Sequence, residues 1–453
     1  MSALEKRASV GLAGIFSVRM LGLFMLLPVM SLYAEDLRGA TPLLMGLAIS
    51  VYGLTQALLQ IPFGLMSDRL GRKNIITVGL FFFAAGSVVA ATSDSIYGVI
   101  LGRALQGSGA VAAAVMALAA DLTHEQNRTK IMATIGISIG ISFGVAMVLG
   151  PLVGAYTGLQ GIFWFSAGLA LFAIVILYQV VPNPSALTVH KDAEPVPKLM
   201  GKVLKDGELL RLDFGIFCLH LVMTAMFVVL PLIFRDELGV EATRHWMIYL
   251  PVLGLSVAAM VPFIIIAEKG RKMKTVFVGA VAMVALASLA MFLSYESFWG
   301  LLASLFVFFT AFNLLEASLP SLISKVAFAG GKGTAMGVYS SAQFFGAFCG
   351  GVMGGTIYQY YGVADVFLVC AGVLSLWFMV AASMKPPRHL CSMLKPIRIE
   401  SEQEAINLTK QLLAITGVVE VAVSADDATA YLKVDNQELD QQVLDGIFQK
   451  TEG

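Results

Sequence analysis

Charged residues are scarce in this sequence. Only 13% of its 453 residues are Asp, Glu, Lys or Arg, whereas 58% are hydrophobic. A soluble protein typically carries about a quarter charged residues, so this chain has too little charge to cover a water-exposed surface of its size. The composition therefore predicts a protein that crosses a lipid bilayer many times.

The sequence also lacks the patterns of several enzyme and binding classes. Its four cysteines show neither disulfide-framework nor metal-site spacing. It contains no Gly-x-x-x-x-Gly-Lys-Ser/Thr segment for ATP phosphates. The formal net charge is zero, which does not favour a nucleic-acid partner. We therefore expect no enzyme activity, no cofactor and no metal site.

Long apolar segments recur along the chain, each able to cross a hydrocarbon core about 30 Å thick. We expect twelve spans, near residues 9–33, 43–66, 74–93, 96–120, 130–156, 161–181, 211–235, 244–267, 274–295, 298–324, 332–360 and 365–383. Most Lys and Arg residues outside the spans fall in the loops that follow even-numbered spans. Because cytoplasmic loops carry the excess of positive charge, we expect both termini in the cytoplasm and the protein in the plasma (inner) membrane.

A charged turn separates the second and third spans. Residues 64–73 read Gly-Leu-Met-Ser-Asp-Arg-Leu-Gly-Arg-Lys. This stretch resembles the loop between spans 2 and 3 of the major facilitator superfamily, G-x-x-x-D-R-x-G-R-K, at every defining position. The resemblance implies an all-α membrane protein with a twelve-helix fold. The alternative is that the basic residues only anchor the topology.

The chain also repeats internally, which favours two related halves. Pro62-Phe63 and Gly71-Arg72-Lys73 recur as Pro262-Phe263 and Gly270-Arg271-Lys272. A parallel duplication of six spans explains this pattern. We expect an N-terminal half at 1–181, a cytoplasmic linker at 182–210 and a C-terminal half at 211–384. Within the linker, residues 198–210 form either a short amphipathic helix or an unstructured segment.

The family resemblance assigns the charged turn a role as a conformational latch. It implies that Asp68 caps the N-terminus of span 11, where the helix dipole is positive. Arg72 is expected to pair with Asp121 at the end of span 4. Such contacts would hold the halves together on the cytoplasmic side. The expected latch residues are Gly64, Asp68, Arg69, Gly71, Arg72 and Asp121.

Charged side chains inside the spans are the candidates for proton coupling, because a bilayer otherwise excludes them. Glu316 in span 10 can become neutral by binding a proton. Arg103 in span 4 resembles the family's R-x-x-x-G arginine, which is linked to proton transfer; since arginine keeps its proton, we expect it to act on a neighbouring carboxylate. His220 in span 7 is the third candidate. The alternatives are a permanently paired Glu316, an Arg103 that only packs helices and a His220 that only hydrogen-bonds a neighbour.

Two further groups of residues bear on transport. Gly150, Pro151 and Gly154 resemble the family's antiporter motif G-P-x-x-G, which favours export; the usual second final glycine is Ala155 here. Small residues at 140, 144, 150 and 154 also predict close helix packing. Polar residues of the spans are expected to line a central substrate cavity: Arg19, Gln56, Gln60, Gln106, Asn313, Tyr339 and Gln343.

After Met384 the chain becomes soluble in character. We expect a strand at 397–400, a helix at 402–415, two strands near 419–423 and 430–434 joined by a turn at 426–427, and a second helix at 439–447. The order β-α-β-β-α predicts a small α+β ferredoxin-like domain, at residues 385–453, that lacks its last strand. Its open sheet edge favours self-association.

Together these features predict a proton-coupled secondary transporter that exports small molecules. Its partners are then a small-molecule substrate, protons and the lipid bilayer. A proton-coupled importer remains an alternative, as does a transporter-derived sensor whose C-terminal domain reads a signal.

Overall fold

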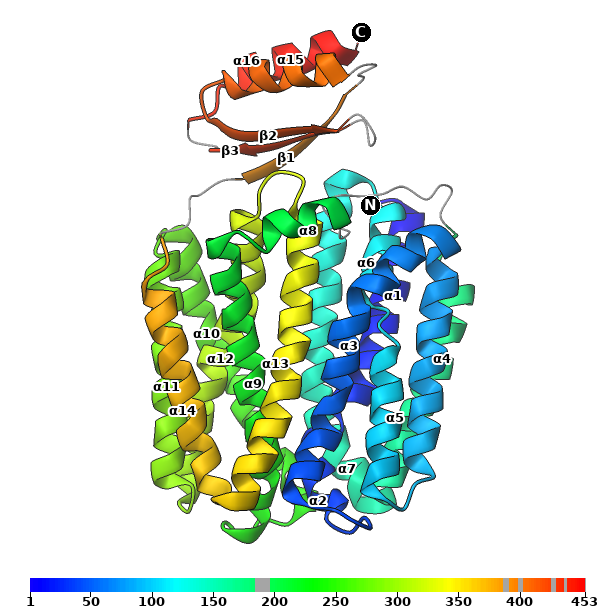
Figure 1. The fold of residues 1–453 in the computed structure, drawn as a ribbon, viewed down its shortest axis with the longest axis vertical. Coiled ribbons are helices and arrows are strands. Elements are labelled where there is room, and N and C mark those ends of the chain that lie inside the picture. Colours follow the sequence, from blue (N-terminus) through cyan, green and yellow to red (C-terminus); the bar gives the residue numbers. More distant parts are fainter. Residues whose placement is uncertain (184–195, 386–390, 398–401, 425–428, 436–437, 453) are drawn as a thin grey trace.

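The structure, a computed structural model, describes residues 1–183, 196–385, 391–397, 402–424, 429–435 and 438–452. A bundle of long helices forms the main body, and a small α+β domain stands at one end of it (Figure 1). The N-terminus lies at that same end. We call this end of the bundle the domain end and the opposite end the far end.

The first half of the bundle contains seven helical segments. They are α1 (Ala3–Phe24), α2 (Met30–Ala34), α3 (Pro42–Leu70), α4 (Arg72–Ala91), α5 (Ile96–Ser108), α6 (Ala112–Asp121) and α7 (Glu125–Gln179). Local sequence sets several of their starts. Ser2 and Glu5 form a capping box on α1, and Thr41 caps α3 directly before Pro42.

The second half begins after a short linker helix, α8 (Pro197–Val203). Its segments are α9 (Gly207–Asp236), the 3-10 turn η1 (Ala242–Arg244), α10 (Trp246–Lys269), α11 (Met273–Ser294), α12 (Phe298–Val326), α13 (Lys332–Tyr360) and α14 (Val363–Ala382). The expected helix at 198–210 is thus shorter, because Asp206 caps the start of α9.

Ten helices among the described residues are long and apolar enough to cross a membrane. One of them contains two spans: α7 breaks at Gly158, whose φ of 65° suits glycine, so the chain reverses there. Glycine-rich α13 has 29 residues and adds the remaining span, although its hydropathy is lower. The twelve-span fold is therefore confirmed, in two six-helix halves.

Two spans that we expected to be continuous are interrupted. Span 1 unwinds between α1 and α2, where Pro28 cannot donate a helical hydrogen bond. Span 4 breaks between α5 and α6 at Gly109. A side chain at Gly109 would overlap the Gly79 carbonyl oxygen, so only glycine permits this close approach. Sequence periodicity did not reveal either break.

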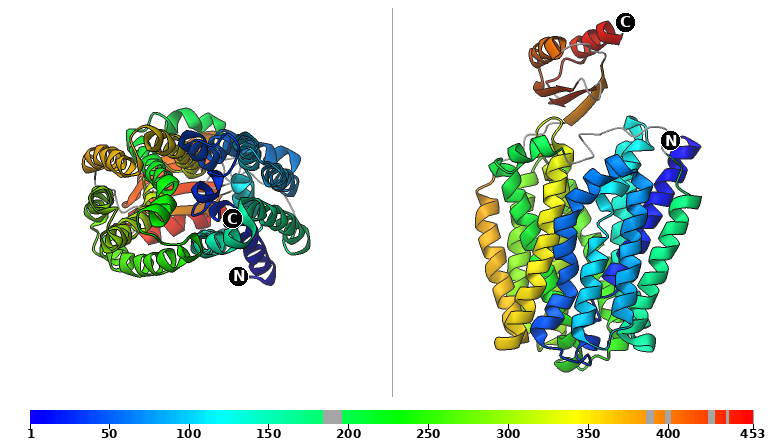
Figure 2. Two further views of the ribbon diagram at one scale, coloured as in Figure 1. Left: turned by 90° about the horizontal axis from the view of Figure 1, so that it is seen from below. Right: turned by 45° about the vertical axis from the view of Figure 1, so that its right-hand side comes forward.

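The two halves meet along α3 and α13, which lie side by side in Figure 1 and in the rotated view of Figure 2. Side chains at Gly46 or Gly53 of α3 would overlap carbonyl oxygens of α13, so the backbones touch. The contact runs from Gly355 at the far end to Ser341, whose hydroxyl donates to the Ala57 carbonyl over 3.2 Å. At the far end, Arg235 also pairs with Glu35 of the other half at 2.8 Å.

The C-terminal domain has the predicted order β-α-β-β-α. Its elements are β1 (Cys391–Pro396), α15 (Glu402–Leu413), β2 (Val418–Ser424), β3 (Thr429–Val434) and α16 (Gln441–Glu452). The antiparallel sheet has the order β1-β3-β2. This arrangement matches a ferredoxin-like fold without its fourth strand. The helices cover one face of the sheet (Figure 1) and share an apolar core with it.

One strand of this domain differs from the expectation. The first strand was expected at 397–400, but it occupies Cys391–Pro396, where Met393 lies opposite Leu432 in the register. Pairing with β3, a tertiary contact, decides its position. Residues 398–401 and the turn at 426–427 lie outside the described residues.

The domain touches the bundle at the loop between α12 and α13. Lys433 donates to the Lys325 carbonyl oxygen at 2.5 Å, and the Ala329 amide donates to Glu420 at 3.2 Å. In the same loop, the Phe328 ring packs against Lys202 of α8. The Lys202 ammonium nitrogen lies 3.9 Å from the centroid of this ring. The domain therefore rests on the segment that leads into α13.

Candidate functional site

The polar residues expected to line a cavity in the N-terminal half form a buried network instead. Arg19 donates to the Tyr52 hydroxyl at 2.6 Å, to Gln56 at 2.8 Å and to the Gly109 carbonyl oxygen at 3.2 Å. Gln56 in turn donates to Gln60 at 2.7 Å. The break in span 4 exposes the carbonyl that Arg19 binds. The network joins α1 and α3 to the break between α5 and α6. Arg19 is only 1% exposed, so it does not face open space.

Arg103 is enclosed in the same half. It donates to the carbonyl oxygens of Ala48 and Ile49 at 3.2 and 2.9 Å and to Gln106 at 2.8 Å. Its guanidinium also lies 5.1 Å from the centroid of the Tyr52 ring. No described carboxylate contacts it, so the expected action on a neighbouring acid is not seen. This geometry favours the alternative in which Arg103 fastens α5 to α3, and its part in proton coupling stays a prediction.

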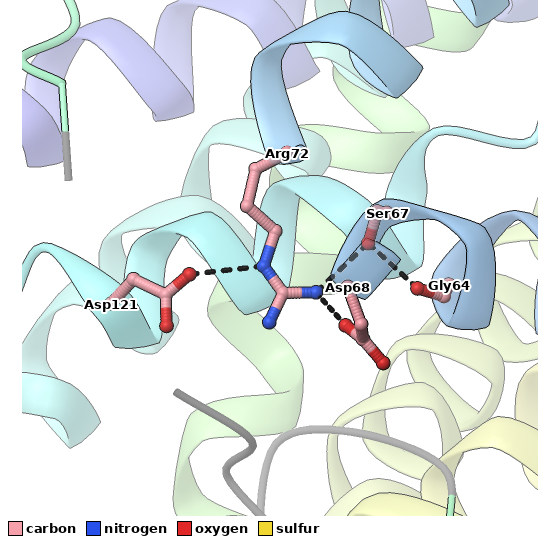
Figure 3. A network of polar contacts seen from close by, with 5 residues as sticks. All are labelled: Gly64, Ser67, Asp68, Arg72 and Asp121. Carbon is pink, nitrogen blue, oxygen red and sulfur yellow. Dashed lines mark hydrogen bonds and ion pairs between the residues drawn. The ribbon is translucent and has the colours of Figure 1, made fainter. Parts of the chain in front are cut away.

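The charged turn between α3 and α4 forms the contacts drawn in Figure 3. Arg72, which is buried, donates to Asp121 at 2.9 Å and to Ser67 at 2.9 Å, and it pairs with Asp68. Ser67 donates to the Gly64 carbonyl oxygen at 2.6 Å. Gly71 has φ of 93°, which allows the reversal between the helices. The expected Arg72–Asp121 pair is therefore present, whereas Arg69 is exposed.

The expected cap on span 11 is not formed in this conformation. No side chain of the described residues caps the N-terminus of α13, which begins after Gly331. Asp68 turns to Arg72 in its own half, four residues along the chain. The Ser341–Ala57 hydrogen bond between α13 and α3 lies eleven residues before Asp68 on α3. The Arg72–Asp121 pair is therefore present in this conformation, whereas the contact between Asp68 and the start of α13 is not.

A second polar cluster lies in the C-terminal half, where α9, α12 and α13 meet. His220 Nε2 is 3.1 Å from Glu316 Oε2. Gln343 Nε2 is 2.7 Å from His220 Nε2 and donates to Glu316 Oε1 at 3.2 Å. The Glu316 side chain remains 38% exposed and His220 13%. Glu316 is therefore paired rather than isolated, and Gln343, expected to contact substrate, holds this cluster.

The His220 nitrogen allows two arrangements of one proton. A ring nitrogen carries either a hydrogen or a lone pair, so Nε2 cannot donate to Glu316 and accept from Gln343 at once. When Nε2 is protonated it donates to the ionised carboxylate. When it is bare it accepts from Gln343. The geometry thus places an acid and a base in direct contact, with the acid partly exposed.

The remaining cavity candidates in this half lie elsewhere. Asn313 donates to Ser256 of α10 at 3.0 Å and does not contact Glu316. Tyr339 is only 3% exposed and its hydroxyl has no hydrogen-bond partner among the described residues. Sequence reasoning overlooked Asp213 of α9, which is 6% exposed. Its signal was available: it is an acid inside an apolar span, two helical turns before His220.

The glycines of α7 behave in two ways. A side chain at Gly150 would lie 2.5 Å from the Met25 carbonyl oxygen, and one at Gly154 would lie 3.0 Å from the Tyr33 ring. Gly150 and Gly154, flanking Pro151, therefore pack closely against the interrupted span 1, as expected. Gly140 and Gly144 have no such neighbour within 4 Å, so the expected packing is wrong for them.

Comparison with known proteins supports the same architecture. The family model described as Major Facilitator Superfamily matches residues 12–344 and 212–414. The Inner membrane transport protein YajR of Escherichia coli (strain K12) is 49% identical over 96% of this chain and 95% of its own. The Quinolone resistance protein NorA of Staphylococcus aureus (strain MSSA476) is 22% identical over 77% of this chain and 89% of its own.

A solved structure gives the likeness in three dimensions. It is the inward-facing and occupied form of a bacterial homolog to the human lysosomal transporter Spinster, with a TM-score of 0.71. It covers 85% of this chain and 98% of its own, at 10% identity. At that identity the likeness concerns the fold alone.

Proposed function

This chain belongs to the major facilitator superfamily and is a multi-pass membrane transporter, and on that premise we propose that it exports small molecules in exchange for protons. In this proposal Glu316 binds the coupling proton. His220 and Gln343 hold the Glu316 side chain in position. The N-terminal half supplies a fixed scaffold through Arg19 and Arg103. The name of the YajR relative places that protein in the inner membrane, and we propose the same location for this chain.

The observation that carries the proposal is the contact between the Glu316 carboxyl group and the His220 ring. The two groups are 3.1 Å apart, and Glu316 has enough exposure to exchange its proton. No lysine or arginine among the described residues pairs with Glu316, so no fixed charge holds it ionised. A carboxylate of this kind can bind and release a proton as the surrounding helices move.

Alternating access supplies the movement. The halves touch at the far end through α3, α13 and the Arg235–Glu35 pair, while the latch at the domain end is released. With both termini in the cytoplasm, as the loop charges indicate, this conformation is inward-facing. Re-forming the Asp68 contact with the N-terminus of α13 would then favour the outward-facing state.

Export is favoured over import by the Gly150-Pro151-Gly154 segment. Gly150 approaches the Met25 carbonyl oxygen in the unwound part of span 1, and Gly154 approaches the Tyr33 ring near the far end. This position fits a role in keeping protons and substrate from leaking while the transporter faces inward. The resemblance of the segment to the antiporter motif supports the same direction.

The test begins with a substrate. A strain lacking this protein and a complemented strain are compared for sensitivity to a panel of antimicrobial compounds that includes a quinolone. A compound that distinguishes them is then followed in proteoliposomes with an imposed pH gradient. We expect accumulation against the compound's gradient for the wild type and no uphill transport for Glu316→Gln.

The matched control is Glu296→Gln, because Glu296 is exposed in the loop before α12. Uphill transport by Glu316→Gln would refute the coupling role. Proton-driven movement in the opposite direction would identify an importer. A compound that binds the C-terminal domain without being transported would instead favour the sensor alternative.

A further inference from the structure

Two basic side chains from different helices meet at the C-terminal end of α7. Arg7 of α1 donates to the Gln179 carbonyl oxygen at 2.5 Å. Lys73 of α4 donates to the Val181 carbonyl oxygen at 2.7 Å. These carbonyls are two residues apart, so both cations lie where span 6 ends, at the domain end of the bundle. We call Arg7 and Lys73 the basic pair.

The basic pair keeps most of its capacity to bind an anion. A guanidinium carries five N–H groups and an ammonium three, and each side chain finds only this one acceptor among the described residues. The acids near them in the sequence have other partners. Glu5 accepts hydrogen bonds at the starts of α1 and α7, and Asp68 pairs with Arg72. Within the described part of the chain, no carboxylate neutralises the basic pair.

An exposed apolar stripe begins beside the basic pair. On α7, Leu171, Val175 and Tyr178 follow the spacing i, i+4, i+7, so they share one face, and all three are exposed. Phe81 of α4 is exposed as well. The Tyr178 hydroxyl lies 3.0 Å from the Thr77 hydroxyl of α4, so the stripe follows the contact between the two helices. In a membrane-spanning bundle, exposed apolar side chains of the spans contact lipid acyl chains.

Tyr178 joins the polar and the apolar parts of this surface. The Lys73 ammonium nitrogen lies 5.8 Å from the centroid of the Tyr178 ring. Tyrosine is enriched where lipid headgroups meet the hydrocarbon core, because its ring is apolar and its hydroxyl is polar. The basic pair is therefore placed at the level of the headgroups, and the apolar stripe lies beside the acyl chains.

The second half of the bundle lacks this arrangement at the corresponding position. Lys272 is the counterpart of Lys73 in the internal repeat, and it is exposed. Its ammonium group forms no hydrogen bond or ion pair within the described residues. The basic pair thus depends on contacts among α1, α4 and α7, and the repeated Gly-Arg-Lys sequence does not produce it alone.

We propose that the basic pair binds the phosphate of an anionic phospholipid whose acyl chains lie along the apolar stripe. Phosphate oxygens accept hydrogen bonds from guanidinium and ammonium groups, and basic pockets between membrane helices attract anionic headgroups. A soluble anion would match the charge and leave the apolar stripe unused, whereas a lipid matches both. The loop charges place the domain end in the cytoplasm, so this lipid belongs to the inner leaflet. The inference goes beyond the proposed function and does not depend on proton coupling.

Photolabelling in lipid nanodiscs tests this site with the full-length protein. The nanodiscs contain phosphatidylcholine and a small fraction of a photoactivatable phosphatidylglycerol. Mass spectrometry of the digested protein measures labelling of residues 171–181, and labelling of α11 serves as the reference for a folded protein in lipid. We expect the phosphatidylglycerol probe to label residues 171–181 more strongly than the matching phosphatidylcholine probe. Unlabelled phosphatidylglycerol should compete with it.

Three variants assign the binding to the basic pair. The double variant Arg7→Gln, Lys73→Gln should raise the half-saturating fraction of the probe about thirtyfold, since each basic residue near an anionic lipid contributes roughly a fivefold factor. The double variant Arg7→Lys, Lys73→Arg keeps both charges and should keep most of the labelling. The matched control is Lys272→Gln, which should leave the labelling of residues 171–181 unchanged.

Three results would overturn the proposal. Equal labelling by the two probes would show a lipid-facing surface without headgroup selectivity. Unchanged labelling in the Arg7→Gln, Lys73→Gln variant would show that the basic pair only caps α7. Competition by inorganic phosphate as effective as that by phosphatidylglycerol would show a site for soluble anions.

Discussion

The two halves of the bundle use buried polar residues in different ways. Within the interior of its spans, the N-terminal half encloses two arginines, Arg19 and Arg103, which donate to backbone carbonyls, amide side chains and a tyrosine. The C-terminal half encloses acids and a histidine, in the Glu316 cluster and at Asp213. A guanidinium keeps its proton at all physiological pH values, whereas carboxylates and imidazole exchange theirs. One half therefore provides fixed charge and the other provides charge that can change.

This contrast explains how two duplicated halves divide one task. The arginine contacts join helices through several bonds each, so the N-terminal half is suited to move as one body. The acid cluster has few bonds, partial exposure and two proton arrangements, so a small free-energy change can alter it. We expect substitutions to affect coupling mainly in the C-terminal half and stability mainly in the N-terminal half.

The largest effect is expected from giving the C-terminal cluster a fixed charge. In His220→Lys, an ammonium beside Glu316 would keep the carboxylate ionised. An opposite charge at this distance lowers proton occupancy at a given pH by about 10- to 1,000-fold. We expect proton-driven transport to be lost in proteoliposomes while binding of the identified compound persists. His220→Gln is the neutral control. Normal proton coupling in His220→Lys would contradict the view that the C-terminal half needs a charge that can change.

A large effect on stability is expected in the N-terminal half. Arg103→Met removes three hydrogen bonds made by a buried cation, each of which contributes about 1.5–3 kcal/mol. We expect a clear drop in the thermal unfolding temperature in detergent micelles. The pH dependence of the remaining transport should keep its wild-type shape. A displaced pH profile would show that Arg103 takes part in coupling after all.

A moderate effect is expected at the latch. Asp68→Asn removes the charge that would cap α13 in the outward-facing state. A charge at a helix N-terminus stabilises the helix by about 0.3–1 kcal/mol, and by up to about 2 kcal/mol when it is partly buried. The population should move toward the inward-facing form by roughly two- to thirtyfold. Spin-label distances between the domain-end termini of α3 and α13 measure this. Identical distance distributions in both proteins would contradict the latch.

The smallest effect on transport is expected from the C-terminal domain. It has its own apolar core and touches the bundle mainly at the α12–α13 loop. A protein truncated after Met384 should therefore retain transport at an altered rate. The fragment from residue 391 to 453 should show a folded circular dichroism spectrum, and light scattering should reveal dimers if the open sheet edge pairs. A complete loss of transport at normal expression would make the domain part of the transport machinery.

Sequence reasoning recovered the fold better than the site. The turn at residues 64–73 and the internal repeat were local signals, and both led to the correct architecture. The cavity residues were chosen only because they are polar within spans, which says nothing about the direction they face. Gln56 and Gln106 proved to be interior partners of the arginines, and Gln60 accepts a hydrogen bond from Gln56. Gln343 proved to be a partner of Glu316.

The sequence by itself determined the properties that depend on composition and order. Scarce charge fixed the membrane class, apolar lengths fixed the spans, and the alternation after Met384 fixed the β-α-β-β-α order. Only the tertiary structure decided which polar groups meet. The pairing of His220 with Glu316 joins residues 96 positions apart, and the burial of Asp213 depends on neighbouring helices. Helix packing brings such groups together through side-chain shape across the whole bundle, and no local pattern encodes that arrangement.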